Sequence, residues 1–225
     1  TDLPPLSVLA DEAVSKTLGG DFPVASRAAD LVENGALDLR VLDAPVDNTL
    51  LISNAQVVVL VTAGEAVGAL STTDDAFVDA VAGVHRDAFE SAATYDLRTP
   101  PLRRVRETLA DDIGADVRDD FDAVLEAVAP DQTDILDEVT VALLVAARND
   151  VLLYDISKWG EDVGIASKAT FSRTKTRLEE AGLIDTEKVP IDVGRPRLRL
   201  TVGDDRLVGD DPAAFAATAA ELLSR

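Results

Sequence analysis

The side chains best suited to chemistry in this chain are basic residues gathered in one stretch. Residues 153–202 contain nine basic and eight acidic residues, a net charge of +1, whereas the rest of the chain carries −22. Four of the five lysines lie in that stretch. A near-neutral segment in a chain of net charge −21 indicates contact with a polyanion. We therefore expect this stretch to bind duplex DNA.

The spacing of these residues predicts how they meet DNA. Thr170, Arg173 and Arg177 share one helix face, because residues three, four and seven apart are neighbours on a helix. Arginine can bond a guanine edge with two hydrogen bonds, and serine or threonine can serve bases or phosphates. The full set predicted to contact DNA is Ser167, Lys168, Thr170, Ser172, Arg173, Thr176, Arg177, Arg195 and Arg197.

The elements that position these residues follow the order of a winged helix-turn-helix. Gly164 permits the positive φ of a tight turn, Ser167 is a preferred N-cap residue, and Gly182 is a preferred helix end. In this motif the second helix lies in the major groove and uses its N-terminal residues on base edges. We expect helices at 140–147, 152–159 and 168–181, a turn at 161–165, and strands at 183–189 and 198–202 around a wing at 190–196.

The upstream part predicts a mixed α/β domain with an antiparallel meander. Three of its strands follow each other too closely for parallel crossovers, which need a dozen or more residues. A last helix there has Asp74 and Asp75 as capping residues and an apolar stripe that includes Phe77 and Val84. The expected helices are 23–32, 73–94 and one after a strand within 7–18; the other strands are 37–42, 49–52, 57–62 and 67–70.

The remaining sequence predicts helices between and after these two regions. Residues 100–128 have apolar side chains at helical spacing, in one helix or in two with Gly114 as the break. Asp211 and Pro212 begin an Ala-rich terminal helix. We expect domains at 1–98 (α/β sensor), 99–133 (connecting or dimerisation helices and linker), 134–202 (winged helix-turn-helix) and 203–225 (C-terminal helix).

Composition argues against an enzyme. The chain has no cysteine and one histidine, His85, which excludes disulfides and thiolate chemistry and leaves almost no material for His-based zinc sites or catalytic triads. Its adjacent aspartate pairs do not face each other on a helix, so they are expected to be solvated surface. We therefore expect no catalytic residue, no metal and no cofactor.

Composition also predicts where the chain works. No apolar run reaches the roughly 20 residues of a membrane span, so we expect a cytoplasmic protein that does not enter membranes. Acids comprise 30 Asp and 12 Glu, against only five Lys. Such composition suits a cytosol of molar salt, where the Debye length falls to roughly 3 Å. The alternative is an acidic protein without salt adaptation.

Three long stretches carry a resemblance to a known family. Residues 153–200, 21–43 and 98–114 resemble the haloarchaeal TbsP family, named as suppressors of the sugar-metabolism regulator TrmB. The resemblance implies an archaeal transcription factor that acts on glycolytic or gluconeogenic genes, with a longer N-terminus than the one present. The upstream domain is similar in layout to the effector-sensing domain of TrmB-type regulators.

Three expectations about partners follow. A homodimer is expected, because palindromic operators match two-fold symmetry; the helices near 101–128 and the terminal helix are its candidate interfaces. A sugar or sugar phosphate is the expected effector of the α/β domain. The alternative function is a winged-helix assembly module that binds protein without specific DNA binding.

Overall fold

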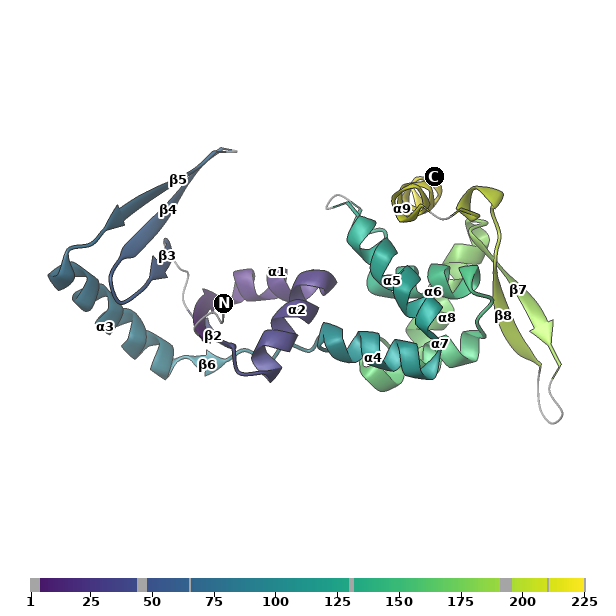
Figure 1. Ribbon diagram of the computed structural model, residues 1–225, viewed down its shortest axis with the longest axis horizontal. Helices are drawn as coiled ribbons and strands as arrows, with labels where there is room; N and C mark the ends of the chain where they lie inside the picture. The colour runs from purple at the N-terminus through teal and green to yellow at the C-terminus, as the bar shows by residue number, and fades with distance from the viewer. Residues whose placement is uncertain are drawn as a thin grey trace. The chain divides into compact units, whose positions relative to one another are not determined.

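The computed structural model describes residues 5–43, 48–64, 66–129, 132–190, 196–209 and 211–224. The chain divides into two compact units (Figure 1). Unit 1 comprises residues 1–20 and 31–96, and unit 2 comprises residues 21–30 and 97–225. Within the described ranges, no helix is both long enough and apolar enough to cross a bilayer.

A small mixed sheet begins unit 1. Strand β1 (Leu6–Asp11) leads into helix α1 (Glu12–Gly20), helix α2 (Phe22–Glu33) follows, and β2 (Leu37–Leu42) returns parallel to β1 with Leu6 opposite Leu37. The two helices supply the crossover that parallel strands require. The third strand, β6 (Ala93–Thr94), pairs antiparallel with β2.

The predicted antiparallel meander is the second sheet of unit 1. Strands β3 (Thr49–Ile52), β4 (Val57–Ala63) and β5 (Ala66–Thr72) pair in that order, which confirms the expectation drawn from their short connections. Side chains of β4 alternate between two faces, and both faces are apolar. A run of this kind is typical of a strand covered on both sides, but in β4 the buried residue is Val57, and residues 61–63 are exposed.

Helix α3 (Asp75–Ser91) differs from its prediction in two ways. Asp74 caps it as expected, because its Oδ1 accepts a hydrogen bond from Phe77 N at 2.9 Å, and the helix begins at Asp75 rather than at the predicted residue 73. It ends before Ala92, whose extended backbone leads into β6, so the predicted extent to residue 94 is wrong. The predicted buried stripe is also wrong in part: Phe77 is 52% and Val84 is 67% exposed, and the buried residue of α3 is Val78.

Unit 2 is built around α6 (Glu138–Arg148). Nine consecutive residues of this helix, 139–147, are buried, and a helix that is apolar on all sides belongs in a core. Asp137 Oδ1 caps its first turn by accepting from Thr140 N at 2.7 Å. The helices and strands packed around it are α5 (Ala115–Ala127), α7 (Leu153–Val163), α8 (Lys168–Glu180), β7 (Ile184–Val189) and β8 (Arg197–Val202).

The helices expected to connect two domains lie inside unit 2. Gly114, with φ 153°, separates α4 (Leu102–Asp112) from α5, so the region forms two helices. Helix α4 packs against α5 and α7, and α5 packs against α9 (Pro212–Leu223), which follows the short helix η1 (Asp205–Leu207). The apolar stripes of α4, α5 and α9 are therefore used within this unit.

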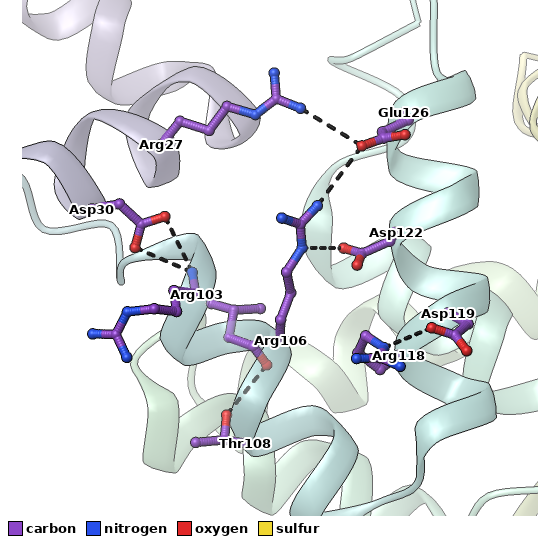
Figure 2. Close-up of polar contacts among 10 residues, drawn as sticks. Arg27, Asp30, Arg103, Arg106, Thr108, Arg118, Asp119, Asp122 and Glu126 are labelled. Carbon is purple, nitrogen blue, oxygen red and sulfur yellow. Dashed lines mark hydrogen bonds and ion pairs between the residues drawn. The ribbon is translucent and has the colours of Figure 1, made fainter. Parts of the chain in front are cut away.

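Residues 22–30 of α2, which belong to unit 2, are joined to the rest of that unit by polar contacts. Asp30 accepts from the backbone N of Arg103 at 3.2 Å, at the start of α4. Figure 2 shows the Arg106 side chain reaching from α4 to α5, where its Nε lies 2.8 Å from Asp122 Oδ1. Arg27 of α2 and Arg106 both approach Glu126. These contacts join α2, α4 and α5; α5 in turn packs against α6, and α4 packs against α7.

Candidate nucleic-acid interface

Helices α7 and α8 form the helix-turn-helix. Helix α7 continues to Val163, so the turn is Gly164–Ser167 rather than the predicted 161–165. Gly164 adopts φ 93°, as its type predicts. Ser167 caps α8, because its Oγ accepts from Thr170 N at 3.2 Å. The cap and the left-handed glycine set the point at which α8 begins.

Close packing fixes how α8 lies on α7. A Cβ at Gly160 of α7 would lie 2.3 Å from the Phe171 ring of α8, so only glycine permits this approach. Phe171 and Leu178 are buried against Trp159 and Ile156 in the same core. Trp159 also donates from Nε1 to Thr108 Oγ1 of α4 at 2.9 Å. The inner face of α8 is thus held, and its outer face is presented to solvent.

The outer face carries most of the predicted DNA contacts. Ser172, Arg173 and Thr176 are exposed, as are Ser167, Lys168 and Arg177, while Thr170 is half-buried. Arg173 Nη2 donates to Thr170 Oγ1 at 3.3 Å. Thr170 therefore positions the guanidinium of Arg173 over the first turn of the helix.

A hollow joins the start of α8 to the wing strand. Lys168 and Ser172 of α8, Arg197 of β8 and Tyr154 of α7 line this hollow, which has a volume of about 390 Å³. Arg197 lies over the Tyr154 ring at 4.5 Å and forms an ion pair with Asp155 at 3.4 Å. Two elements distant in the sequence, α8 and β8, thus present cationic groups around one concave surface.

Two predicted wing contacts have different outcomes. Arg197 is the first residue of β8, one residue before the predicted start of that strand, and its guanidinium reaches back to α7. Arg195 lies outside the described residues.

Arg177 lies apart from the hollow. Its Nη2 donates to Thr140 Oγ1 in the buried first turn of α6 at 2.8 Å. This hydrogen bond ties the C-terminal half of α8 to the core. The structure therefore brings together Lys168, Ser172 and Arg197 around the hollow, joins Arg173 to Thr170 by a hydrogen bond, and gives Arg177 an anchoring contact.

Comparison with protein families agrees with this geometry. A family model described as the C-terminal HTH domain of TbsP-like transcriptional regulators matches residues 101–220, more than half of the chain. The chain belongs to the TbsP-like family. The family's N-terminal model matches residues 1–100. No curated protein and no solved structure matches the chain.

Family membership makes this chain a transcriptional regulator with a helix-turn-helix domain. The family's domain boundary, between residues 100 and 101, lies close to the division between the two units at 96 and 97. It assigns α4 and α5 to the TbsP-like HTH domain, with which they pack. A regulatory role also favours the expectation that the protein is not an enzyme.

Carboxylates compete for two of the cations in the interface. Lys168 Nζ lies 2.9 Å from Glu161 Oε2, and the same carboxylate accepts from the Lys168 backbone N at 3.3 Å. The hydrogen bond from the Lys168 side chain holds the pKa of Glu161 below its ordinary value. The same bond raises the pKa of Lys168. Glu161 thus pairs with a lysine that is predicted to contact DNA.

Replacing Glu161 with glutamine is expected to strengthen binding to duplex DNA about two- to five-fold at low salt, because an exposed pair holds its partners only weakly. The amide oxygen can still accept the backbone hydrogen bond, so α8 keeps its start. Fluorescence anisotropy with a labelled duplex measures the effect. Asp162→Asn removes an equal charge one residue away, from the pair with Lys158. An equal gain in Asp162→Asn would show that only net charge matters.

Two residues that sequence reasoning did not select belong to this surface. Ala169 is exposed in the first turn of α8, one turn before Arg173, and a methyl group there can meet a thymine methyl. Tyr154 lines the hollow and stacks on Arg197. The sequence could have indicated Ala169 by its position on the same helix face as Arg173. It contains no indication of Tyr154, because the contact of Tyr154 depends on β8 folding back against α7.

Proposed function

We propose that this TbsP-like regulator binds duplex DNA in a sequence-specific way, with α8 in the major groove. The observation that carries the proposal is the exposure of Arg173 on α8, the helix whose Lys168 and Ser172 line a hollow together with Arg197. In this arrangement Arg173 and Ala169 meet base edges. Lys168, Ser172 and Arg197 meet phosphates on the flanking backbone.

We propose further that the protein works in the cytoplasm of a halophilic archaeon. The proposal rests on a net charge of −21 and on the excess of aspartate over lysine. In molar salt the charges of the acidic body are screened beyond roughly 3 Å. The few cations of the interface then act at contact distance without long-range repulsion from the body.

The genes of sugar breakdown and synthesis are the proposed targets, on the basis of the resemblance in residues 21–43, 98–114 and 153–200. A genome-wide map of the bound chromosomal sites in the source cell tests this. Sites upstream of such genes are expected. Sites confined to other genes would overturn the proposal that sugar-metabolism genes are the targets. A map without enriched sites would overturn the proposal of sequence-specific DNA binding.

The proposed assembly is a homodimer formed through β5. Residues 49–72, which span the meander, contain a single charged residue in a chain that is 28% charged. Val67 and Leu70 are 67% and 68% exposed on opposite faces of β5. Long uncharged edge strands pair with other strands unless protected. Two copies of so acidic a chain meet most easily at such a face, with antiparallel β5 strands related by a two-fold axis.

Replacing Val67 with lysine is expected to convert the dimer to a monomer of 23.8 kDa, because a lysine protects a strand edge from pairing. Sedimentation equilibrium measures the mass. Val14→Lys is the matched control, since Val14 is 58% exposed on α1 in the same unit. A monomeric wild-type protein, or a dimer that persists in Val67→Lys, would contradict this interface.

The second candidate function is an assembly module whose winged helix contacts protein alone. The ion pairs Lys168–Glu161 and Arg197–Asp155 favour it, since they reduce the cationic character of the surface. The two functions differ in their response to salt. When a protein contacts phosphates, the logarithm of its affinity for DNA falls linearly with the logarithm of the salt concentration. An assembly module shows no specific duplex binding at any salt concentration.

A further inference from the structure

A cavity in unit 1 has a charge character opposite to that of the chain. It has a volume of about 340 Å³ and lies between β1, β2, β3 and α3. Among the described residues that line it there is no aspartate or glutamate, although the chain has 42 acidic residues. Its ionisable lining groups are Arg86 and His85, the only histidine of the chain. The lining is therefore suited to an anion.

Arg86 is available to a ligand. It makes no hydrogen bond or ion pair with any residue that the structure describes. The other described arginine of unit 1, Arg40, is occupied: its guanidinium lies 4.5 Å from the Phe89 ring and donates to the Phe89 carbonyl O at 3.1 Å. Arginine presents a fork of N–H donors that matches phosphate and carboxylate groups. Arg86 is therefore free to pair with an external anion.

The rest of the lining adds hydroxyl recognition to this charge. Ser7, Asn48 and Asn54 contribute groups that can donate and accept hydrogen bonds. Leu50, Ile52 and Phe89 supply apolar walls. A few polar groups among apolar ones are typical of a small-molecule site, and the volume lies at the small end of such sites.

We propose that this cavity binds a small organic anion bearing hydroxyl groups, a sugar phosphate or a sugar acid, whose charged group pairs with Arg86. A role of this ligand as the effector that controls DNA binding rests on the proposed function. Binding itself is a property of unit 1.

Thermal unfolding of the full chain tests the site without DNA. Glucose 6-phosphate, gluconate and glucose are compared at equal ionic strength, since they share a six-carbon skeleton and differ in charged group. At least one of the two anions is expected to raise the melting temperature by about 5 °C at ten times its Kd, and the rise should grow with the logarithm of its concentration. Which anion does so identifies the charged group as phosphate or carboxylate.

Two variants test whether the shift in melting temperature arises from the cavity. Arg86→Gln is expected to abolish the shift, and Ala82→Leu is expected to reduce it by filling the cavity. Lys16→Gln is the control, because Lys16 is an exposed cation of α1 paired with Glu12 outside the cavity. No shift with either anion, an equal shift with glucose, or a shift that survives Arg86→Gln would overturn the site. None of these outcomes would affect the DNA-binding proposal, which this assay does not involve.

Discussion

Arg173→Ala is expected to weaken binding to the preferred duplex by about 5- to 150-fold, which corresponds to about 1–3 kcal/mol for a lost guanine contact. The reason is the position of Arg173 on the exposed face of α8, with its guanidinium hydrogen-bonded to Thr170 at 3.3 Å. Competition between the preferred duplex and one-base variants measures both affinity and specificity. We expect discrimination at one base pair to disappear in the variant.

Two further substitutions separate base reading from charge. Arg173→Lys keeps the charge but removes the two-pronged hydrogen bond, so it should lose specificity while it retains non-specific affinity. Lys175→Ala removes a charge from the same helix on its inner side, where Lys175 pairs with Glu179 at 2.7 Å. Affinity should therefore change little in Lys175→Ala. An unchanged base preference in both Arg173 variants would contradict the role of Arg173 and show that another residue of α8 contacts the base.

Gly160→Ala is expected to destabilise unit 2 by about 2 kcal/mol. The added Cβ would lie 2.3 Å from the Phe171 ring, so α7 and α8 must separate or the ring must move. Overpacking of a core costs about 1–3 kcal/mol, and so short a distance places Gly160→Ala at the upper end of that range. The better helix propensity of alanine returns about 1 kcal/mol, which leaves a net loss of about 2 kcal/mol. Urea unfolding followed by the fluorescence of Trp159, the single tryptophan, reports on this unit.

Two variants isolate the clash as the cause. Gly83→Ala in α3 has nothing within 4 Å of the added Cβ, so it should stabilise its helix by up to about 1 kcal/mol. Because Gly83 lies in unit 1, urea unfolding of this variant is followed by circular dichroism of the full chain. Gly160→Ala combined with Phe171→Leu should cost less than the sum of the two single changes, because the smaller side chain makes room for the methyl. Strict additivity would show that Gly160 and Phe171 do not constrain each other.

Local signals in the sequence were sufficient for the boundaries of most elements. Asp74, Ser167 and Asp211 each cap the helix for which they were chosen, since capping depends on a few adjacent residues. Gly164 ends α7 and Gly114 separates α4 from α5, and both adopt the positive φ that glycine permits. The helix-turn-helix and its exposed N-terminal face follow from such signals together with apolar spacing.

Features that depend on distant contacts were not predictable. The end of α3 is set by the pairing of β6 with β2 and by Arg40, which donates to the carbonyl O of Phe89. The hydrogen bond of Arg177 to Thr140 spans 37 residues. Phe77 and Val84 are exposed although their helical spacing predicts a buried stripe. Periodicity identifies an apolar face of a helix but does not show whether another element covers it.

Selection from a pool of random-sequence duplexes tests the central claim most directly, since the operator need not be identified beforehand. The wild-type protein is expected to enrich two inverted half-sites whose centres are one helical turn, or a multiple of it, apart. Arg173→Ala should enrich the same spacing with one base position lost from each half-site. A folded wild-type protein that enriches no sequence over the input pool would contradict the account of α8 as a reader of DNA.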